Sequence, residues 1–435
     1  MASFLVEGGA PLKGEIYPQG AKNEALQVLA ALLLSEKEVR ISNLPLIRDV
    51  LLMIDILREL GVEVHREEER VYLFSAKHLN PEVLLRSSFQ EKVGFLRGSI
   101  LMIAPLLFRW NKLILSAPGG DNVGKRRMDT LMSGLKALGV KIEYSFQKNE
   151  YTFSTKGFVG SDILLEEASV TGTANLIMAA VMAKGDTTIY HAACEPYIQQ
   201  LCRMLVRMGA KIEGIGTNYL RIQGVSSLAG TEHVLLADVI EVGSFIGLAA
   251  LTQSEITIPQ AGIKDLGATP TIFRKMGITV HHRGEDLHVP VQDNYVIKKC
   301  LDDSFITLSD SIWPGISPDL ISIGIVTAIQ AQGCVLFHQR MFESRLFFVD
   351  VLIQMGAHIT LCDPHRVLVI GLNRQKRMRA VRMSSPDIRA GVALLLAALS
   401  AEGTSKIDNV EQIDRGYEDL CQRLGKIGAR IRRID

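Results

Sequence analysis

The apolar and polar positions along the chain follow a pattern that occurs six times. In each copy a helical pattern ends with an apolar residue and a glycine, and a strand pattern follows. Glycine is expected directly after a helix, because it adopts the left-handed conformation at little cost. The six glycines, spaced 78, 70, 68, 79 and 72 residues apart, are Gly61, Gly139, Gly209, Gly277, Gly356 and Gly428. Such a near-constant period predicts a chain built from copies of one structural unit.

Each repeat also has an earlier helix that is apolar nearly all round, which favours a buried position. We predict these buried helices at Asn23–Leu34, Gly94–Leu107, Thr173–Ala183, Val242–Leu251, Leu320–Ala331 and Ile388–Ala401. A short strand is predicted between the two helices of each repeat, at Glu38–Ile41, Lys112–Leu115, Thr187–Tyr190, Glu255–Ile258, Cys334–Phe337 and Thr404–Ile407. The second helix is amphipathic and ends at the glycine. Two more strands follow it, most clearly at residues 62–64 and 71–74.

The repeat is therefore helix, strand, helix, strand, strand. Six such units predict an α/β protein with its helices inside and its sheets facing outward. We expect two lobes of three repeats each, with a cleft between them. The pattern itself leaves the closure and the grouping of the repeats open.

Composition is that of a globular protein with a large core. The chain has 435 residues, 47% of them apolar and 22% charged, which indicates roughly two or three domains. The net charge of +1 gives no argument for nucleic acid or an anionic membrane as a partner. Any anion must instead be bound by cations gathered locally.

Cysteine usage and the N-terminal sequence predict a cytoplasmic protein. The six cysteines are scattered without metal-site or disulfide spacing, so we expect reduced thiols. The first residues lack the order of charges and apolar positions that marks a signal peptide. The longest apolar runs, near 99–108 and 390–398, are too short to span a bilayer.

Basic residues recur where helices begin, although a cation there opposes the helix dipole. Lys22, Arg97 and Arg389 lie at the starts of buried helices with very apolar flanks. Since a buried cation without a partner is costly, a bound phosphate or carboxylate would balance both the cation and the dipole. Arg48 and Arg345, predicted to begin amphipathic helices, are explained equally well by pairing with nearby carboxylates. The carboxylates near the arginines of this set are Asp49, Glu343 and Asp387.

The segment Pro118–Asp129 interrupts the second repeat with three glycines, carboxylates and three cations. Such a loop on its own is most often a solvated turn. Because it is inserted into only one of six repeats, we interpret it as a functional lid. No metal-binding motif, P-loop or dinucleotide-binding glycine motif occurs in the sequence.

Five segments resemble the enolpyruvyl transferases, and the resemblance covers essentially the whole chain. They are Gly20-Ala21-Lys22-Asn23, the Pro118–Asp129 loop, Phe342-Glu343-Ser344-Arg345, Asp387-Ile388-Arg389 and Ile413-Asp414-Arg415-Gly416-Tyr417-Glu418. The resemblance implies a two-lobed inside-out α/β barrel with six βαβαββ-type repeats, three per lobe. One lobe would span 21–236 and carry the loop, and the other would combine 1–20 with 237–435. The active site would lie in the cleft between them.

The resemblance also implies an activity. The enolpyruvyl group of phosphoenolpyruvate would pass to the 3′-hydroxyl of UDP-N-acetylglucosamine through a tetrahedral ketal, releasing phosphate. This is the first committed step of peptidoglycan synthesis. It needs two small-molecule substrates, no cofactor or metal, and no nucleic acid or membrane.

Two alternatives remain open at this point. One is transfer to shikimate 3-phosphate, against which Phe95-Leu96-Arg97-Gly98-Ser99 lacks the Gly-Asn-Ala-Gly-Thr pattern of that branch. The other is a non-catalytic paralogue that retains the fold, against which the whole set of cations is present.

Residue roles are implied in the same way. The catalytic group would be Asp121, Lys22, Asp319 and Arg415, with Asp319 as the base and Glu343 as the alternative. Lys22 would hold the substrate phosphate, Asn23 would contact the sugar, and Ser169, Val170 and Thr171 would grip the uridine diphosphate. The residues implied to bind phosphoenolpyruvate and the ketal are Arg97, Arg126, Arg389 and Arg415, and Met341 is a further substrate contact.

The sequence departs from the family pattern in the loop and near the nucleotide. Asp121 stands where the family usually has cysteine, so a carboxyl group would have to donate the proton that a thiol normally supplies. Epoxides such as fosfomycin, which alkylate that thiol, should therefore be ineffective. Arg127 and Leu131 replace a proline and a histidine. Glu167 and Val239 occupy positions that often hold a lysine and an arginine facing the nucleotide.

Overall fold

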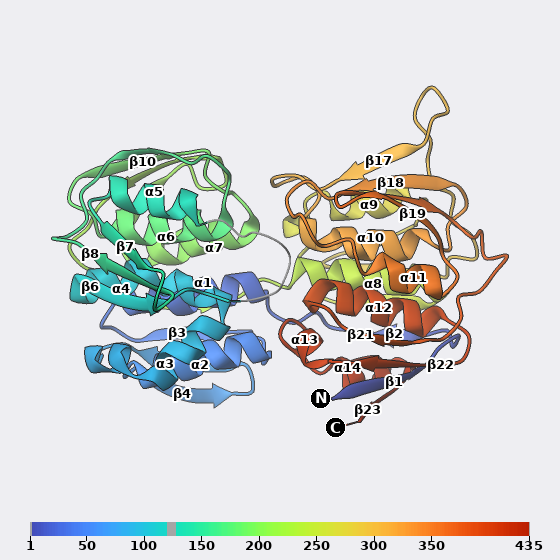
Figure 1. Ribbon diagram of the computed structural model, residues 1–435, viewed down its shortest axis with the longest axis horizontal. Coiled ribbons are helices and arrows are strands. Elements are labelled where there is room, and N and C mark those ends of the chain that lie inside the picture. The colour runs from blue at the N-terminus through green and yellow to red at the C-terminus, as the bar shows by residue number, and fades with distance from the viewer. Residues whose placement is uncertain (1, 120–127, 435) are drawn as a thin grey trace. The chain divides into compact units, whose positions relative to one another are not determined.

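The computed structural model describes residues 2–119 and 128–434, and its elements follow the predicted repeat (Figure 1). The six glycines that end the amphipathic helices all have positive φ, from 85° at Gly277 to 108° at Gly209. This confirms the predicted helix caps, because that conformation is favourable only for glycine.

One largely buried helix occurs in every repeat. All residues of α8 after the first are buried, as are all residues of α12 except the last. The six helices are α1 (Lys22–Ala31), α4 (Ile103–Trp110), α6 (Val170–Val181), α8 (Val239–Leu251), α10 (Ile321–Ala328) and α12 (Ile388–Ser400). The burial predicted from their composition is confirmed.

The second of these helices differs from its predicted span of 94–107. The helix α3 (Ser87–Phe95) is capped by Leu96, and a 3-10 segment, η3 (Arg97–Met102), leads into α4. Pro105 has no N–H to donate and is placed in the first turn of α4, where none is needed. Among the described residues no single helix is long and apolar enough to cross a membrane. Only the pair 87–95 and 97–110, bent by 109°, passes that test when taken together.

The amphipathic helices are only partly buried. Each ends two residues before its glycine. They are α2 (Arg48–Glu59), α5 (Asp129–Ala137), α7 (Pro196–Arg207), α9 (Thr269–Lys275), α11 (Val349–Gln354) and α14 (Leu420–Lys426).

The described strands form six separate sheets, and not one closed barrel. In the repeats that precede residue 237 the sheet orders are β13-β3-β5-β4, β6-β8-β7 and β11-β12-β10-β9. These strands are β3 (Val39–Ser42), β4 (Glu63–Glu68), β5 (Val71–Ser75), β6 (Lys112–Ser116), β7 (Lys141–Ser145), β8 (Glu150–Ser154), β9 (Asp162–Leu164), β10 (Asp186–Tyr190), β11 (Lys211–Glu213), β12 (Tyr219–Gln223) and β13 (Thr231–Val234).

The other three sheets have the orders β21-β22-β1-β23, β15-β16-β14-β2 and β17-β18-β20-β19. Their strands are β1 (Ser3–Glu7), β2 (Lys13–Glu15), β14 (Glu255–Ile258), β15 (His281–Arg283), β16 (Asp286–Val289), β17 (Ile306–Ser309), β18 (Cys334–His338), β19 (His358–Asp363), β20 (Arg366–Ile370), β21 (Arg382–Ser384), β22 (Thr404–Asp408) and β23 (Arg430–Ile434). The pattern did not predict the short parallel edge strands β2, β9, β13, β17 and β21.

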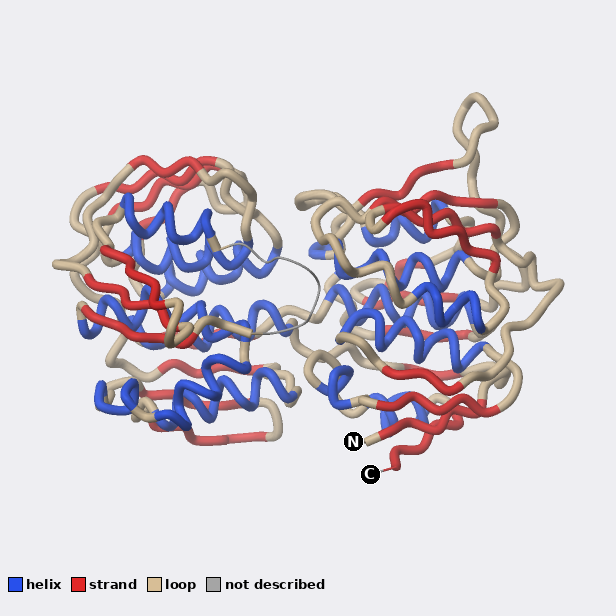
Figure 2. The backbone as a smooth tube through the Cα atoms, in the orientation of Figure 1, coloured by secondary structure: helices blue, strands red, loops and turns tan. Residues whose placement is uncertain are grey.

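The described residues divide into two compact units with one hydrophobic core each. The middle unit contains 20–119 and 128–236, and the terminal unit contains 2–19 and 237–434. The N-terminal segment belongs with the C-terminal half because β1 pairs with β22 and β23, and β2 pairs with β14. Within each unit the helices lie inside and the strands outside (Figure 2), as the repeat predicts.

Candidate active site

In the middle unit, Lys22 is the first residue of α1 and is almost completely buried. Its Nζ donates to Oδ2 of Asp49 at 2.7 Å, and Asp49 lies in the first turn of α2 with 4% of its surface exposed. Lys22 therefore has a carboxylate partner, which the sequence did not indicate. Asp49 pairs with this buried lysine, while its neighbour Arg48 is exposed.

Asn23 and Arg97 lie on adjacent elements of the same unit, and both are half-buried. Arg97 opens η3, which packs against α1. A side chain at Gly98 would come within 2.9 Å of Leu26, one turn after Lys22, so glycine permits this close packing. The structure thus gathers Lys22, Asn23 and Arg97 around the start of α1.

The predicted nucleotide segment forms the N-terminus of α6. Ser169 is the N-cap, and its hydroxyl accepts from the backbone N–H of Gly172 at 3.2 Å. Ser169, Val170 and Thr171 are half-buried, and Glu167 just before them is exposed. A helix N-terminus carries partial positive charge, which suits the phosphates of a nucleotide.

In the terminal unit, Asp319 binds two arginines at once. Its Oδ1 accepts from Nη1 of Arg345, and its Oδ2 lies 3.0 Å from Nη2 of Arg389. The side chains of Arg345 and Arg389 are only 9% and 8% exposed. Two buried guanidinium groups therefore share the one carboxylate of Asp319.

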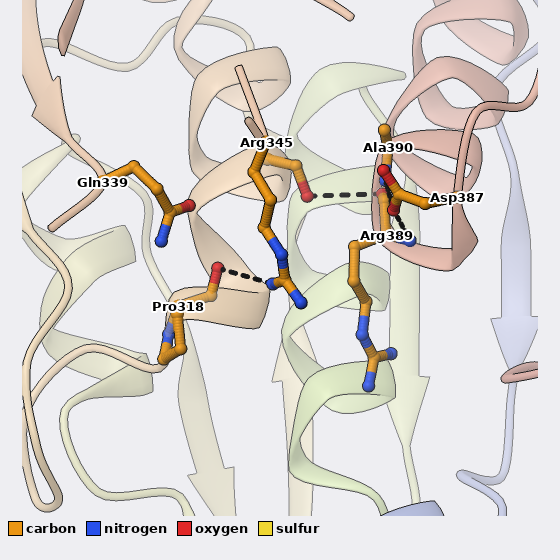
Figure 3. A pocket seen from close by; sticks show the side chains of 7 residues that line it. Pro318, Gln339, Arg345, Asp387, Arg389 and Ala390 are labelled. Atoms are coloured by element: carbon orange, nitrogen blue, oxygen red, sulfur yellow. Dashed lines mark hydrogen bonds between the residues drawn. The ribbon is translucent and has the colours of Figure 1, made fainter. Parts of the chain in front are cut away.

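A small pocket adjoins this cluster, as Figure 3 shows. Both arginine side chains point along it, and Nη1 of Arg345 also donates to the carbonyl of Pro318 at 3.4 Å. The Nε of Arg345 is buried without a hydrogen-bond partner in the described structure. Such an unpaired donor is costly, and an oxygen of a ligand would satisfy it. The lining residues are Pro318, Ser322, Gln339, Arg345, Asp387, Arg389 and Ala390.

Besides its ion pair with Asp319, Arg389 contacts Tyr417. Its guanidinium lies 5.7 Å from the centre of the tyrosine ring, and its Nη1 donates to the tyrosine hydroxyl at 3.4 Å. Burial acts to lower the pKa of Arg389, but the charge of Asp319 and the contact with Tyr417 outweigh it, so the pKa is raised above its ordinary value. Arg389 is therefore a fixed positive charge. Its helix is capped by Asp387, which accepts from the N–H of Arg389 at 2.7 Å.

Arg415 follows the short helix α13 (Glu411–Asp414) and is 6% exposed. Its Nη1 donates to Oε1 of Gln412 at 3.0 Å. A Cβ on the next residue, Gly416, would lie 2.4 Å from Cγ2 of Ile388, the residue directly before Arg389. This close contact brings the segment of Arg415 against the start of α12.

Met341 and Glu343 lie on the same loop as Arg345, and both are exposed. The backbone N–H of Met341 donates to the buried carboxylate of Asp310 at 3.1 Å. The helix α11 begins at Val349, so the prediction that Arg345 begins a helix is wrong. The side chain of Arg345 covers the ring of Phe342 at 4.1 Å.

Two predicted residues, Asp121 and Arg126, lie outside the described residues, as does Arg127. Across 2–119 and 128–434, no group of three or more histidine, cysteine, aspartate or glutamate side chains is arranged to hold a metal ion.

The sequence interpretation missed the buried pairs and one member of the cluster. Arg389, like Lys22, was expected to lack a carboxylate partner, and Asp319 supplies one. Arg345 was given no ligand role, yet it shares Asp319 with Arg389 and lines the pocket. The signal available for Arg345 was its place in the Phe342–Arg345 motif.

Comparison with known proteins places these features in context. The family model described as EPSP synthase (3-phosphoshikimate 1-carboxyvinyltransferase) matches residues 6–424. A protein of Bacteroides thetaiotaomicron named UDP-N-acetylglucosamine 1-carboxyvinyltransferase is 55% identical over 434 residues, covering 100% of both chains. A protein of the same name from Porphyromonas gingivalis is 54% identical, again over 100% of both chains.

Solved structures share the fold at lower identity. The enolpyruvyl transferase NikO from Streptomyces tendae has a TM-score of 0.85 and 21% identity, covering 99% of this chain and 98% of its own. An EPSP synthase from Acinetobacter baumannii has a TM-score of 0.74 and 16% identity, over 100% of both chains. These likenesses confirm the predicted fold class.

Proposed function

The chain belongs to the EPSP synthase family of enolpyruvyl transferases, and from this membership we propose its reaction and its residue roles. The protein transfers the enolpyruvyl group of phosphoenolpyruvate to the 3′-hydroxyl of UDP-N-acetylglucosamine and releases phosphate. One observation carries this conclusion: full-length identity of 55% to a protein named for that activity. The likeness to EPSP synthases is one of fold at 16% identity, so transfer to shikimate 3-phosphate is not favoured. The reaction belongs to peptidoglycan synthesis.

The reaction is an addition followed by an elimination. The sugar oxygen bonds to the central carbon of phosphoenolpyruvate while the methylene carbon gains a proton, which gives the tetrahedral ketal. The methyl group then loses a proton as the bond to the phosphate oxygen breaks. The site must therefore supply an acid, a base and cations for the phosphate and carboxylate groups.

In the terminal unit, Arg345, Arg389 and Arg415 are assigned to phosphoenolpyruvate and the ketal. The support is the sharing of Asp319 by two buried arginines and the open donor of Arg345. Preorganised guanidinium groups stabilise developing negative charge without reorganising during the reaction.

Asp319 is our candidate base for the 3′-hydroxyl, with Glu343 as the alternative. Each of its two oxygens is engaged by an arginine. A carboxylate oxygen accepts about two hydrogen bonds, so a sugar hydroxyl can bind Asp319 without displacing either arginine. Met341 contributes a side-chain contact to the substrate.

In the middle unit, Lys22 and Arg97 bind the phosphate group that leaves, and Asn23 contacts the sugar. Asp49 fixes the Lys22 ammonium in place. The N-terminus of α6, with Ser169, Val170 and Thr171, binds the uridine diphosphate. That the cations of both units act on one pair of substrates is part of this proposal.

Asp121 and Arg126 complete the assignment from the loop, with Asp121 as the acid that protonates the methylene carbon. Their roles rest on their positions in the Pro118–Asp129 loop alone. A cytoplasmic location also stays a prediction.

Phosphate release tests the function directly. The purified protein is incubated with phosphoenolpyruvate and either UDP-N-acetylglucosamine or shikimate 3-phosphate. We expect phosphate only with the nucleotide sugar. Release only with shikimate 3-phosphate would establish the other branch, and release with neither would indicate a non-catalytic paralogue.

A further inference from the structure

Gln19 is a completely buried residue of the terminal unit, three positions before Lys22 in sequence. Its side chain makes two hydrogen bonds to one turn far along the chain. Its Nε2 donates to the carbonyl of Gly416 at 2.8 Å, and its Oε1 accepts from the N–H of Glu418 at 2.8 Å. The side-chain amide therefore binds the backbone on both sides of Tyr417.

The backbone of Gln19 is itself fixed. Its N–H donates to Oε2 of the buried Glu241 at 2.6 Å, and its carbonyl accepts from the N–H of Asp238 at 2.8 Å. The carboxylate of Glu241 in turn accepts hydrogen bonds from both terminal nitrogens of Arg423, at 2.6 and 3.0 Å. A bidentate charged pair of this kind has a defined geometry, so Gln19 has little freedom to shift.

The Gly416–Glu418 turn adjoins or contacts two of the proposed substrate cations. Arg415 is the residue immediately before it. Tyr417 lies inside the turn. Its hydroxyl forms a hydrogen bond with the hydroxyl of Ser244 at 2.9 Å and accepts another from Nη1 of Arg389. Gly416 packs directly on Ile388, beside Arg389. A small movement of the turn would therefore displace both guanidinium groups.

We propose that Gln19 is a positioning residue for phosphoenolpyruvate binding, acting through the Gly416–Glu418 turn on Arg415 and Arg389. This inference rests on the proposed function, because it takes those arginines as the ligands of that substrate. Gln19 does not touch the substrate. Its contribution is to hold the cations in the geometry that the reaction needs, where small misplacements have large effects on rate.

A purely structural role predicts a loss of stability and nothing else, so a matched control is needed. Gln292 is a second buried glutamine of the terminal unit. Its Oε1 accepts from the N–H of Thr279 at 3.1 Å and its Nε2 donates to the carbonyl of Pro290 at 2.8 Å. It makes the same two kinds of backbone bond as Gln19, but contacts none of the proposed site residues.

The experiment compares Gln19→Met and Gln292→Met, which remove the side-chain hydrogen bonds and keep the side-chain length. Both variants should have lower melting temperatures than the wild type. We expect kcat/KM for phosphoenolpyruvate to fall by about tenfold or more only in Gln19→Met, with KM for UDP-N-acetylglucosamine within about threefold of the wild type. Gln19→Glu keeps the size and the acceptor but loses the donor to Gly416. It should also lower kcat/KM for phosphoenolpyruvate.

Kinetic constants in Gln19→Met and Gln19→Glu equal to those of Gln292→Met would overturn the inference. An equal fall in kcat/KM for phosphoenolpyruvate and for UDP-N-acetylglucosamine would also overturn it. The wild-type assay separates this outcome from failure of the proposed function: an active wild type with unaffected Gln19 variants refutes only the positioning role. A wild type that releases no phosphate refutes the proposed function itself.

Discussion

Arg389, which lines the pocket in the terminal unit, forms an ion pair with Asp319, with Nη2 and Oδ2 3.0 Å apart. The other oxygen of the same carboxylate accepts from Arg345. Asp319 thereby fixes two cations in place. This arrangement suits a substrate that brings both a phosphate and a carboxylate.

Replacing Asp319 with asparagine should affect both turnover and stability. The amide cannot take the proton of the sugar hydroxyl, so we expect kcat to fall by about 100-fold or more, as for loss of a general base. It also removes the carboxylate that two buried guanidinium groups share, which should lower the free energy of unfolding by about 3–5 kcal/mol. Steady-state kinetics and denaturant unfolding measure the two effects.

Glu343→Gln is the comparison for that experiment, because Glu343 is the alternative base and is exposed. It should retain nearly full turnover and stability. If Glu343→Gln loses turnover while Asp319→Asn keeps it, the two assignments must be exchanged.

The Lys22–Asp49 pair offers a prediction about stability in the middle unit. Asp49→Asn leaves a buried ammonium beside a neutral group, so the free energy of unfolding should fall by about 3–5 kcal/mol. Glu255→Gln is the matched control. It breaks the ion pair between Glu255 and Lys13, whose side chains are 40% and 81% exposed, respectively. Exposed ion pairs contribute little to stability. Equal losses in the two variants would show that Lys22 does not depend on Asp49.

Much of the fold was predictable because its signals are local. Gly277 and Gly209 end helices through their own backbone conformation, and the apolar composition of α8 alone indicates its burial. The interruption at Leu96 was not predicted, because the apolar run after it conceals the break. Local composition gives the type of an element, whereas a break depends on how its neighbours pack.

The candidate site was predictable as a set of cations but not as a set of pairs. Lys22 and Arg389 were identified from their unusual positions at helix starts. Their partners Asp49 and Asp319 come from other elements, and a single sequence does not show which distant carboxylate meets which cation. Gln19 carried no sequence signal, since its importance lies in two backbone groups near residue 417.

The hydroxyl of Tyr417 should make stability sensitive to alkaline pH. Burial raises its pKa from 10.0 to about 12, against the opposing effect of Arg389. Between these values the unfolded chain loses the tyrosine proton and the folded chain keeps it. The stability that Tyr417 contributes is therefore fully present below pH 10 and is lost as the pH rises towards 12, by up to about 3 kcal/mol.

Tyr417→Phe, which has no hydroxyl to ionise, should lose less stability than the wild type over that range. Denaturant unfolding at pH 8, 10 and 11 measures the difference. Identical pH profiles for the two proteins would show that the hydroxyl does not titrate as its burial requires.

The loop aspartate gives a prediction about inhibition. The family usually carries a cysteine at the position of Asp121, and an epoxide such as fosfomycin reacts with the thiolate of that cysteine. A carboxylate is a much weaker nucleophile towards an epoxide than a thiolate. The wild type should therefore show no time-dependent inactivation by fosfomycin, and Asp121→Cys should remain active and become inactivated over time.

Asp121→Asn tests whether the carboxyl group is the acid of the reaction. An amide has no proton acidic enough to give to the methylene carbon, so phosphate release should fall by about 100-fold or more. Binding of UDP-N-acetylglucosamine, followed by calorimetry, should persist because the nucleotide groups at the start of α6 are unchanged. If Asp121→Asn turns over as fast as the wild type, the loop acts only as a cover and another group supplies the proton. If Asp121→Cys resists fosfomycin while remaining active, residue 121 is not the site of alkylation.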